Sequence, residues 1–383
     1  MILDRAALPP EVLSLIFDET DTQDLPSVLR ASSQFYSIGY SSLYREIPNC
    51  KTGRKRVQLL QSLARAADPA FHPARLPSPA LAVRLLSLDF HSSNVNGNLL
   101  RLVNRALRAT TNLHELLLEF SAANSFEPTS WCLLGTTFRP RRLYTSVGLD
   151  GPLFSWLAHP NQQDITELNL RGHRMLRAKR SGSGAVLPPD ALPALASFRS
   201  VHLDSASVAL FLAGRPVQSV GLTLFPFAAE RSLDALRTTS TPVRRLTVLC
   251  LEEPASDALV AAIAARLPAL ESLHVVILAT PFSAEKLMAL APILARFEAL
   301  RYITFMAPDM PGTDKLTTDS ERTIVTVWAE ACPTLRTIIL PMGQVWYSED
   351  KAWRCYADAQ VTRAAVETAD EQETEDIQET QDE

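Results

Sequence analysis

The chain of 383 residues has little that would cross-link it or anchor it in a bilayer. Its five cysteines are scattered without a close pair, which argues against a disulfide framework or a thiolate metal site and predicts reduced, mostly buried thiols. The longest uninterrupted apolar run, Ala258–Ala265, is far shorter than the ~18 residues that a membrane-spanning helix needs. The amino terminus also lacks a basic region followed by an apolar one. We therefore expect no membrane segment and no secretory signal, and a location in the cytoplasm, the nucleus or both.

Catalytic motifs are missing as well. The seven histidines are dispersed, and the chain contains no H-E-x-x-H, no G-x-S-x-G and no P-loop. The short glycine-rich stretch at Ser181–Gly184 is typical of a flexible loop rather than of a phosphate cradle. The sequence therefore predicts a protein that is not an enzyme, with no cofactor and no metal. An active site assembled from distant residues is the alternative that a motif search leaves open.

Charge is distributed unevenly along the chain. Residues Glu367–Glu383 hold nine acids and no Lys or Arg, and removing these nine from the net charge of −5 leaves the first 366 residues at +4. Two basic stretches, Lys51–Arg56 and Arg171–Arg180, could attract phosphate, which makes nucleic-acid binding an alternative function. Neither stretch is interleaved with stacking aromatic residues. We interpret both as solvated loops and do not expect a nucleic-acid partner.

Residues 8–47 carry the spacing of three short helices. In "LPPEVLSLIF" two prolines suit a helix start, and apolar residues recur behind them at helical spacing. Asp21, Thr22 and Asp24 can cap a second helix, and "ASSQFYSIGYSSLYREI" predicts a third. An amphipathic run at 57–67 is followed by Asp68–Pro79, where four prolines in twelve residues predict a domain boundary.

After Pro79 the phrase apolar-x-x-apolar-x-apolar occurs ten times, with helical stretches between its copies. The central apolar residues are spaced by 28 residues on average. They are Leu86, Leu116, Leu143, Leu168, Val201, Val220, Leu246, Leu273, Ile303 and Ile338. One strand and one helix per repeat predict a parallel sheet with the helices on its outer side.

The phrase resembles the leucine-rich repeat over Val83–Leu340, in a degenerate form. The asparagine of that family has no counterpart at the expected positions, which are Ser121, His173, Ala206, Phe225, Leu251, Leu278, Pro308 and Gly343. This resemblance implies an α/β fold, an irregular leucine-rich-repeat-like solenoid. We divide the chain into a helical module (1–50), a helix and Pro-rich linker (51–79), the solenoid (80–343), a C-terminal cap (344–366) and an acidic disordered tail (367–383).

The first forty residues, with "LPPEV" followed by "IF" and then by "DL", resemble the F-box. That resemblance implies a three-helix module that docks on the Skp adaptor of cullin-RING ubiquitin ligases, followed by repeats that select a protein substrate. A small helical unit buries little surface alone, so an exposed apolar face would be stabilised by a partner. The expected adaptor-binding residues are Leu8, Pro9, Glu11, Val12, Leu15, Ile16, Leu25, Val28 and Leu29.

Residues that alternate with the buried ones in each strand are expected to form a polar strip on the concave side of the sheet. The expected substrate-binding residues are Glu115, Arg142, Tyr144, Glu167, Asn169, Arg171, His202, Asp204, Arg245, His274 and Tyr302. Mixed charges and aromatic rings suit protein recognition. The sequence thus predicts a non-catalytic substrate receptor of a ubiquitin ligase. Two alternatives stay open: an interaction scaffold of the same fold outside any ligase, and an amino-terminal module that merely caps the solenoid.

Overall fold

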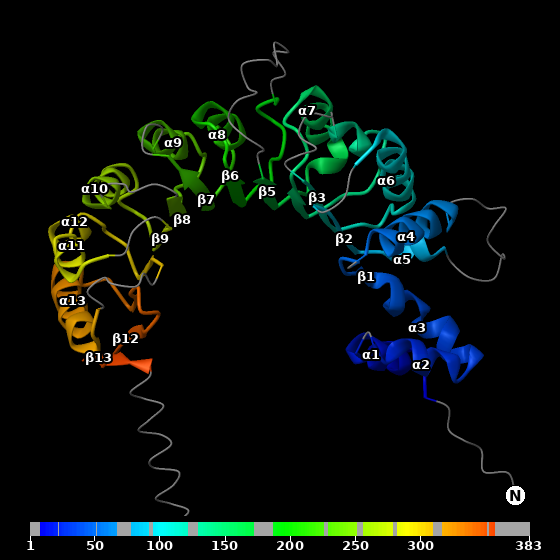
Figure 1. Cartoon of the computed structure of the whole chain (residues 1–383), viewed down its shortest axis with the longest axis horizontal. Coiled ribbons are helices and arrows are strands. Elements are labelled where there is room, and N and C mark those ends of the chain that lie inside the picture. Colours follow the sequence, from blue (N-terminus) through cyan, green and yellow to red (C-terminus); the bar gives the residue numbers. More distant parts are fainter. Residues whose placement is uncertain are drawn as a thin grey trace, which may run out of the picture. The chain divides into compact units, whose positions relative to one another are not determined.

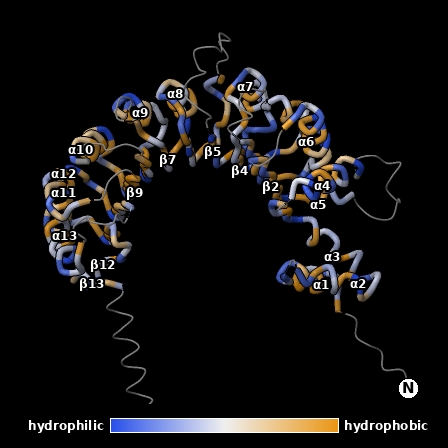
Figure 2. Tube along the Cα trace, in the orientation of Figure 1, coloured by the Kyte–Doolittle hydropathy of each residue, from blue (hydrophilic) through white to orange (hydrophobic). Residues whose placement is uncertain are grey.

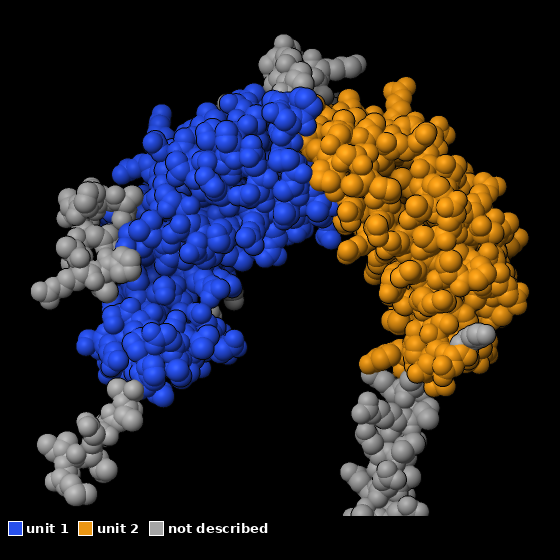
Figure 3. Space-filling view, turned by 180° about the vertical axis from the view of Figure 1, so that it is seen from behind, with its two compact units in different colours: residues 1–203 blue, residues 204–383 orange. Residues whose placement is uncertain are grey.

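A computed structural model of the whole chain is drawn in Figure 1. The structure describes residues 8–21, 23–50, 52–66, 78–91, 95–121, 129–171, 187–225, 229–250, 256–278, 282–308, 316–350 and 352–356. They form two compact units, residues 1–203 and 204–383 (Figure 3). Within each unit the strands make a mostly parallel sheet, so the predicted α/β class is confirmed. Among the described residues no helix is both long and apolar enough to cross a bilayer. The predicted tail (367–383) and most of the basic insertion (172–186) lie outside the described residues.

Unit 1 begins with three helices, as the sequence predicts. They are α1 (Pro10–Glu19), α2 (Leu25–Arg30) and α3 (Ser33–Arg45). Pro10 is the first residue of α1, where a missing N–H costs no hydrogen bond. The hydroxyl of Ser32 caps α3 by accepting hydrogen bonds from the backbone amides of Gln34 and Phe35. Figure 2 shows hydrophobic residues interleaved with hydrophilic ones in all three helices.

The three helices have a core of their own. Leu13, Phe17, Leu25 and Leu29 are buried together, and the ring of Phe17 meets that of Phe35 edge-on at 5.6 Å. Helix α3 approaches this core closely at Gly39. A Cβ atom at Gly39 would lie 2.5 Å from Cδ2 of Leu29 and 2.7 Å from Cδ2 of Phe17. The glycine is therefore required by packing between helices, since any side chain would displace the core residues.

The sheet of unit 1 contains six parallel strands that pair in chain order. They are β1 (Glu46–Ile47), β2 (Leu85–Phe90), β3 (Glu115–Phe120), β4 (Arg142–Thr145), β5 (Glu167–Arg171) and β6 (Ser197–Val201). Buried and partly exposed residues alternate along β2 and β3, so one face packs against helices and the other stays accessible. Because β1 pairs with β2, the sheet starts well before the predicted solenoid boundary at residue 80.

Helices and 3₁₀ turns connect these strands on one face (Figure 1). They are α4 (Gly53–Ala66), α5 (Pro79–Ala82), α6 (Gly97–Ala109), η3 (Ser130–Leu133), α7 (Gly151–Leu157) and η4 (Pro160–Gln162). Helix α6 is strongly amphipathic and buries Leu100, Val103 and Leu107. Helix α4, which we had placed in a linker, packs against α6 and thus serves as the helix of the first repeat.

Unit 2 repeats the strand and helix alternation. Its strands are β7 (Ser219–Leu224), β8 (Arg245–Cys250), β9 (Ser272–Ile277), β10 (Tyr302–Met306), β11 (Thr337–Ile339), β12 (Val345–Glu349) and β13 (Ala352–Cys355). Its helices are α8 (Ser205–Leu212), α9 (Ala229–Leu236), α10 (Ser256–Arg266), α11 (Ala284–Met288), α12 (Ala291–Leu294) and α13 (Thr318–Ala331). Strands β7–β11 are parallel, and β12 and β13 are antiparallel. Helices α11 and α12 are separate, because Pro292 has no N–H with which to continue a helix from α11.

Nine of the ten central residues of the sequence phrase lie in register with their neighbours within their own unit. Leu86, Leu116, Leu143 and Leu168 are cross-strand partners in unit 1, and the five from Val220 to Ile338 are partners in unit 2. The tenth assignment is wrong. In β6 the partner of Leu168 is Phe198, not Val201. The correct phrase runs Leu195-x-x-Phe198-x-Ser200, and its third position is a buried serine rather than an apolar residue.

The antiparallel hairpin β12–β13 occupies the residues predicted as the cap, and it is held by a buried carboxylate. Glu321 of α13 is fully buried and accepts a hydrogen bond from the indole N–H of Trp346 (3.1 Å) and a longer one from the amide of Met342 (3.4 Å). Burial raises the pKa of the Glu321 carboxyl above its usual value, although these two hydrogen bonds lower it. Residues 357–366 of the predicted cap lie outside the described residues.

We expect Glu321→Gln to stabilise unit 2 above about pH 4.3, the ordinary value for glutamate in an unfolded chain. The folded pKa is raised, so between the unfolded and folded values the native state binds more protons and wild-type stability falls as pH rises. Glutamine keeps an acceptor for Trp346 without this charge. The difference should grow by about 1.4 kcal/mol per pH unit between the two pKa values. Urea unfolding of both proteins from pH 4 to 8 tests this, and parallel curves would contradict it.

Candidate functional site

Helix α1 presents an exposed apolar face. Leu8, Val12, Leu15 and Ile16 are 50, 39, 68 and 46% exposed. Val12, Leu15 and Ile16 lie on one side of the helix by their spacing of three and one residues, and Leu8 lies in the segment just before Pro10, where α1 begins. Leu13 and Phe17 lie on a different side of α1 and belong to the module's core. The helix therefore has two apolar sides, one used internally and one open to solvent.

The remaining residues predicted to bind an adaptor divide into two groups. Pro9 precedes α1 and Glu11 lies in its first turn, and both are exposed beside the apolar face. Leu25 and Leu29 do not belong to an exposed face, contrary to our expectation. They are 1 and 3% exposed because α2 packs them against Leu13 and Phe17. Val28 is partly buried against the same core.

The open face of the unit 1 sheet carries a ladder of charged residues. The first row across the strands is Glu115, Arg142 and Glu167, which are Cα partners in register. The guanidinium of Arg142 pairs with Glu115 at 2.9 Å. Tyr144 lies two residues further along β4, and its pKa is raised by burial and then by a hydrogen bond to Glu167. In unit 1 these side chains are exposed or partly exposed on neighbouring strands, and Asn169, two residues after Glu167 on β5, is partly exposed as well.

A second charged group lies at the carboxyl ends of these strands. Nδ1 of His91 is 2.6 Å from Asp89 and 3.7 Å from Glu119, and Arg171 pairs with Glu119 at 2.8 Å. Burial alone would raise the pKa of Asp89, but hydrogen bonds from His91 and the positive charge of Arg56 lower it.

Asp89, His91 and Glu119 bring three potential metal ligands within 4.8 Å of one another. Arg171 pairs with Glu119, and Arg56 lies near Asp89. Both arginines compete with a divalent ion for these carboxylates. We therefore interpret the group as a network of charges across neighbouring strands. Ion pairs as exposed as these each contribute only about 0–1 kcal/mol to stability. We therefore consider them for the charged surface that they offer to a partner.

Two residues of the predicted strip do not lie on a strand. His202 follows β6 in a left-handed backbone conformation (φ 62°). The carboxylate of Asp204 caps α8 by accepting hydrogen bonds from the amide and the hydroxyl of Ser207. Both errors follow from the misplaced repeat phrase. The strand positions that alternate with the buried ones in β6 are Ser197, Arg199 and Val201.

In unit 2 the predicted residues are brought onto neighbouring strands. Arg245 of β8 and Tyr302 of β10 are both Cα partners of Ser272, and both are exposed. His274 lies two residues along β9, with Nε2 3.0 Å from the hydroxyl of Ser272. Burial lowers the pKa of His274, so the imidazole is neutral at pH 7 and can exchange a hydrogen bond with this hydroxyl.

Several exposed residues of unit 2 were missed at the sequence level. Arg301 and Arg336 immediately precede β10 and β11, and Leu249, Val276 and Met306 alternate with the buried residues of β8–β10. Met306 is 54% exposed. The three apolar residues were not recognised because an apolar residue in a strand reads as core, and only the strand's period could place them on the open face.

Comparison with known proteins adds no family assignment. Neither a scan against protein-family models nor a search of curated proteins gave a match to this chain.

Proposed function

We propose that this protein is a non-catalytic substrate receptor, which docks through α1 on the Skp adaptor of a cullin-RING ubiquitin ligase and binds a protein client on its strand faces. The F-box resemblance of residues 8–47 suggests the adaptor. The observation that carries the proposal is the exposed apolar face of α1 on a helical module that already has its own core.

Two physical considerations support docking at this face. Fully burying a valine, leucine or isoleucine side chain contributes about 1.5–3 kcal/mol. Covering the exposed parts of Leu8, Val12, Leu15 and Ile16, which are 39–68% exposed, would therefore favour binding. The module's core is complete without them, because Leu13, Phe17, Leu25 and Leu29 pack together beneath. A partner can therefore cover Leu8, Val12, Leu15 and Ile16 without rearrangement of the helices.

The strand faces support client binding. In each unit the helices lie on one face of the sheet (Figure 1). The other face carries exposed charged and aromatic residues. In unit 1 these are the charged ladder around Arg142 and Glu115, and in unit 2 they include Arg245 and Tyr302. Arginine and tyrosine often anchor protein interfaces.

Capture of the full chain by an immobilised, purified Skp adaptor tests the proposal. The intact chain should be retained, and Leu15→Asp or Ile16→Asp should weaken retention at least about tenfold, since each would bury an unpaired charge. Leu134→Asp is the matched control, because Leu134 is another exposed leucine of unit 1 (40%) away from α1. Circular dichroism would check that the helices persist. Failure of the intact chain to bind would favour the ligase-independent scaffold instead.

A further inference from the structure

The open face of the unit 2 sheet is ordered in three rows that cross its strands. The register pairs Arg245, Ser272, Tyr302 and Thr337 in the first row, nearest the strands' amino-terminal ends. The second row consists of Thr247, His274, Thr304 and Ile339. The third row, near the carboxyl-terminal ends, consists on β8–β10 of Leu249, Val276 and Met306, and Thr223 of β7 is the register partner of Leu249. The chemistry of the face therefore changes from polar to apolar along the strands.

The amino-terminal edge is cationic. Arg244, Glu271, Arg301 and Arg336 directly precede β8–β11 and are linked in that order by backbone hydrogen bonds of 2.8 Å. Arg244 is neutralised by Glu271 at 2.9 Å. Arg245, Arg301 and Arg336 are exposed, and no carboxylate among the described residues pairs with them. Within the part of the chain that the structure describes, these three arginines thus place positive charge without a paired carboxylate along the amino-terminal edge of the sheet.

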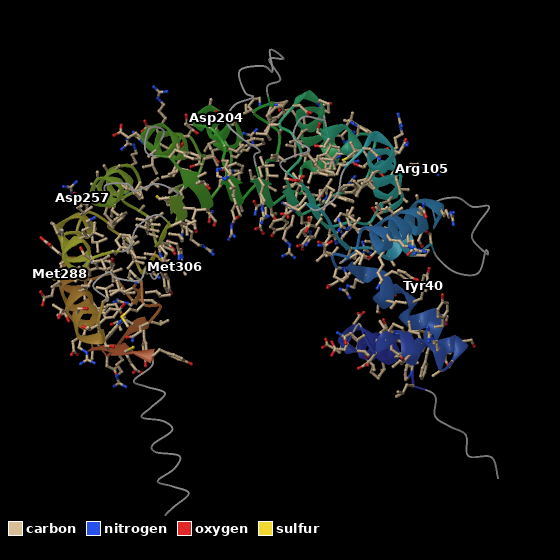
Figure 4. The ribbon with its side chains drawn as sticks, viewed as in Figure 1. Tyr40, Arg105, Asp204, Asp257, Met288 and Met306 are labelled. Carbon is tan, nitrogen blue, oxygen red and sulfur yellow. The ribbon has the colours of Figure 1, made fainter. Side chains whose placement is uncertain are left out.

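The carboxyl-terminal edge is apolar. Met306 is 54% exposed, and Leu278, which directly follows β9, is 52% exposed. Leu249 and Val276 lie beside Met306 in the same row and are partly exposed. Figure 4 places Met306 on the strand side of unit 2 and Met288 on the helix side, so Met306 points away from the helices. These side chains offer apolar surface that a partner can cover.

From this arrangement we infer that the open face of unit 2 binds an extended segment of the client in which acidic and apolar residues alternate. Strands lie about 4.8 Å apart, so the arginine edge from β8 to β11 is about 14 Å long. In an extended segment laid across the strands, successive side chains on the same side are about 6.6 Å apart. Five residues therefore span the edge.

Alternation follows from the distance between the two edges. Arg245 and Leu249 are four residues apart on β8, which corresponds to about 13 Å. If the segment lies over the middle row, its long side chains can reach the arginine edge on one side and the apolar edge on the other. Its acidic residues would face the arginines, where charge-assisted hydrogen bonds are strong, and its apolar residues would face Leu249, Val276 and Met306. Thr247 in the middle row offers a hydroxyl to its backbone.

This inference rests on the client-binding half of the proposed function and is independent of adaptor docking. Two labelled peptides test it on the full chain by fluorescence anisotropy, Glu-Leu-Glu-Phe-Glu-Leu-Glu and its counterpart with lysine in place of glutamate. The acidic peptide should bind and the basic one should not. The double substitution Arg245→Ala with Arg301→Ala should weaken binding about tenfold, as should Met306→Asp. Arg231→Ala, which removes an exposed arginine from helix α9 of unit 2, away from the strand face, is the matched control and should leave affinity unchanged.

Equal binding of both peptides, absence of binding, or equal affinity in the three variants would overturn the inference. The chain's own acidic segment 367–383 is the competing occupant. A full chain whose nine acids there are replaced by their amides should bind the acidic peptide with unchanged affinity. Binding seen only in that variant would assign the surface to the carboxyl terminus and overturn the client assignment. Adaptor capture, measured on the same proteins, separates the two proposals. If the full chain binds the acidic peptide but not the adaptor, only the docking proposal is contradicted. If it binds the adaptor but not the acidic peptide, only this inference is contradicted.

Discussion

Replacing Phe17 with alanine is expected to destabilise the α1–α3 module by about 3–5 kcal/mol. The side chain is 2% exposed, its ring meets Phe35 edge-on at 5.6 Å, and it packs where Gly39 allows α3 to come close. Alanine would leave a cavity that three short helices cannot easily fill. Adaptor capture should fall with stability, since the exposed face of α1 exists only when the helix is held in place.

The matched variant is Leu15→Ala, two residues before Phe17 on the same helix. Leu15 is 68% exposed, so its truncation should change stability by less than about 0.5 kcal/mol while still weakening adaptor capture. Native-state hydrogen exchange of the α1–α3 amides measures both effects. Equal protection of these amides in Phe17→Ala and Leu15→Ala would contradict the assignment of the two sides of α1.

Replacing Trp328 with alanine is expected to destabilise unit 2 by about 3–5 kcal/mol. The side chain is fully buried in α13, its ring lies 5.5 Å from that of Phe305 in β10, and its indole N–H donates a 2.8 Å hydrogen bond to the carbonyl of Leu287 in α11. One residue thus joins two helices to the sheet. Its removal would open a large cavity and take away one donor from the carbonyl of Leu287, which keeps the backbone amide of Leu290 at 3.1 Å.

Two variants separate the contributions of Trp328. Trp328→Phe keeps one aromatic ring but loses the second ring of the indole and the N–H donor, so it should cost about 1–3 kcal/mol, less than alanine. Glu330→Ala, at an exposed position of the same helix, should change stability by less than about 0.5 kcal/mol. Hydrogen exchange of the β9 and β10 amides reports on each. If Trp328→Ala left this exchange at the wild-type rate, the described packing of α13 would be wrong.

Much of the fold could be predicted because each repeat buries the same pattern of side chains. Leucine or another apolar residue stands at the first, fourth and sixth positions wherever a strand packs against a helix, so periodicity identified nine of ten strands in register. The pattern failed at β6, where Ser200 takes the third buried position and the phrase was shifted to Val201. Strand β1 has two residues, which is too short to show the pattern.

The candidate surfaces could be predicted only where the spacing of residues along a single helix or strand determines which side chains share a face. Helical spacing placed Val12, Leu15 and Ile16 on one face of α1, and these residues are exposed, as is Leu8 just before the helix. Leu25 and Leu29 have the same spacing on α2, yet they are buried, because tertiary packing decides which apolar stripe of a helix turns inward. The apolar row of unit 2 was hidden for a related reason. Hydrophobicity alone does not tell which face of a strand a residue occupies.

The most direct test of the central claim is hydrogen exchange of the full chain with and without purified Skp adaptor. The account predicts that the adaptor slows exchange of the α1 amides, residues 10–19, and leaves those of α13 in unit 2 unchanged. Unchanged exchange in α1 at an adaptor concentration that saturates binding, or protection confined to the strands, would contradict the proposal that the exposed side of α1 is the docking surface.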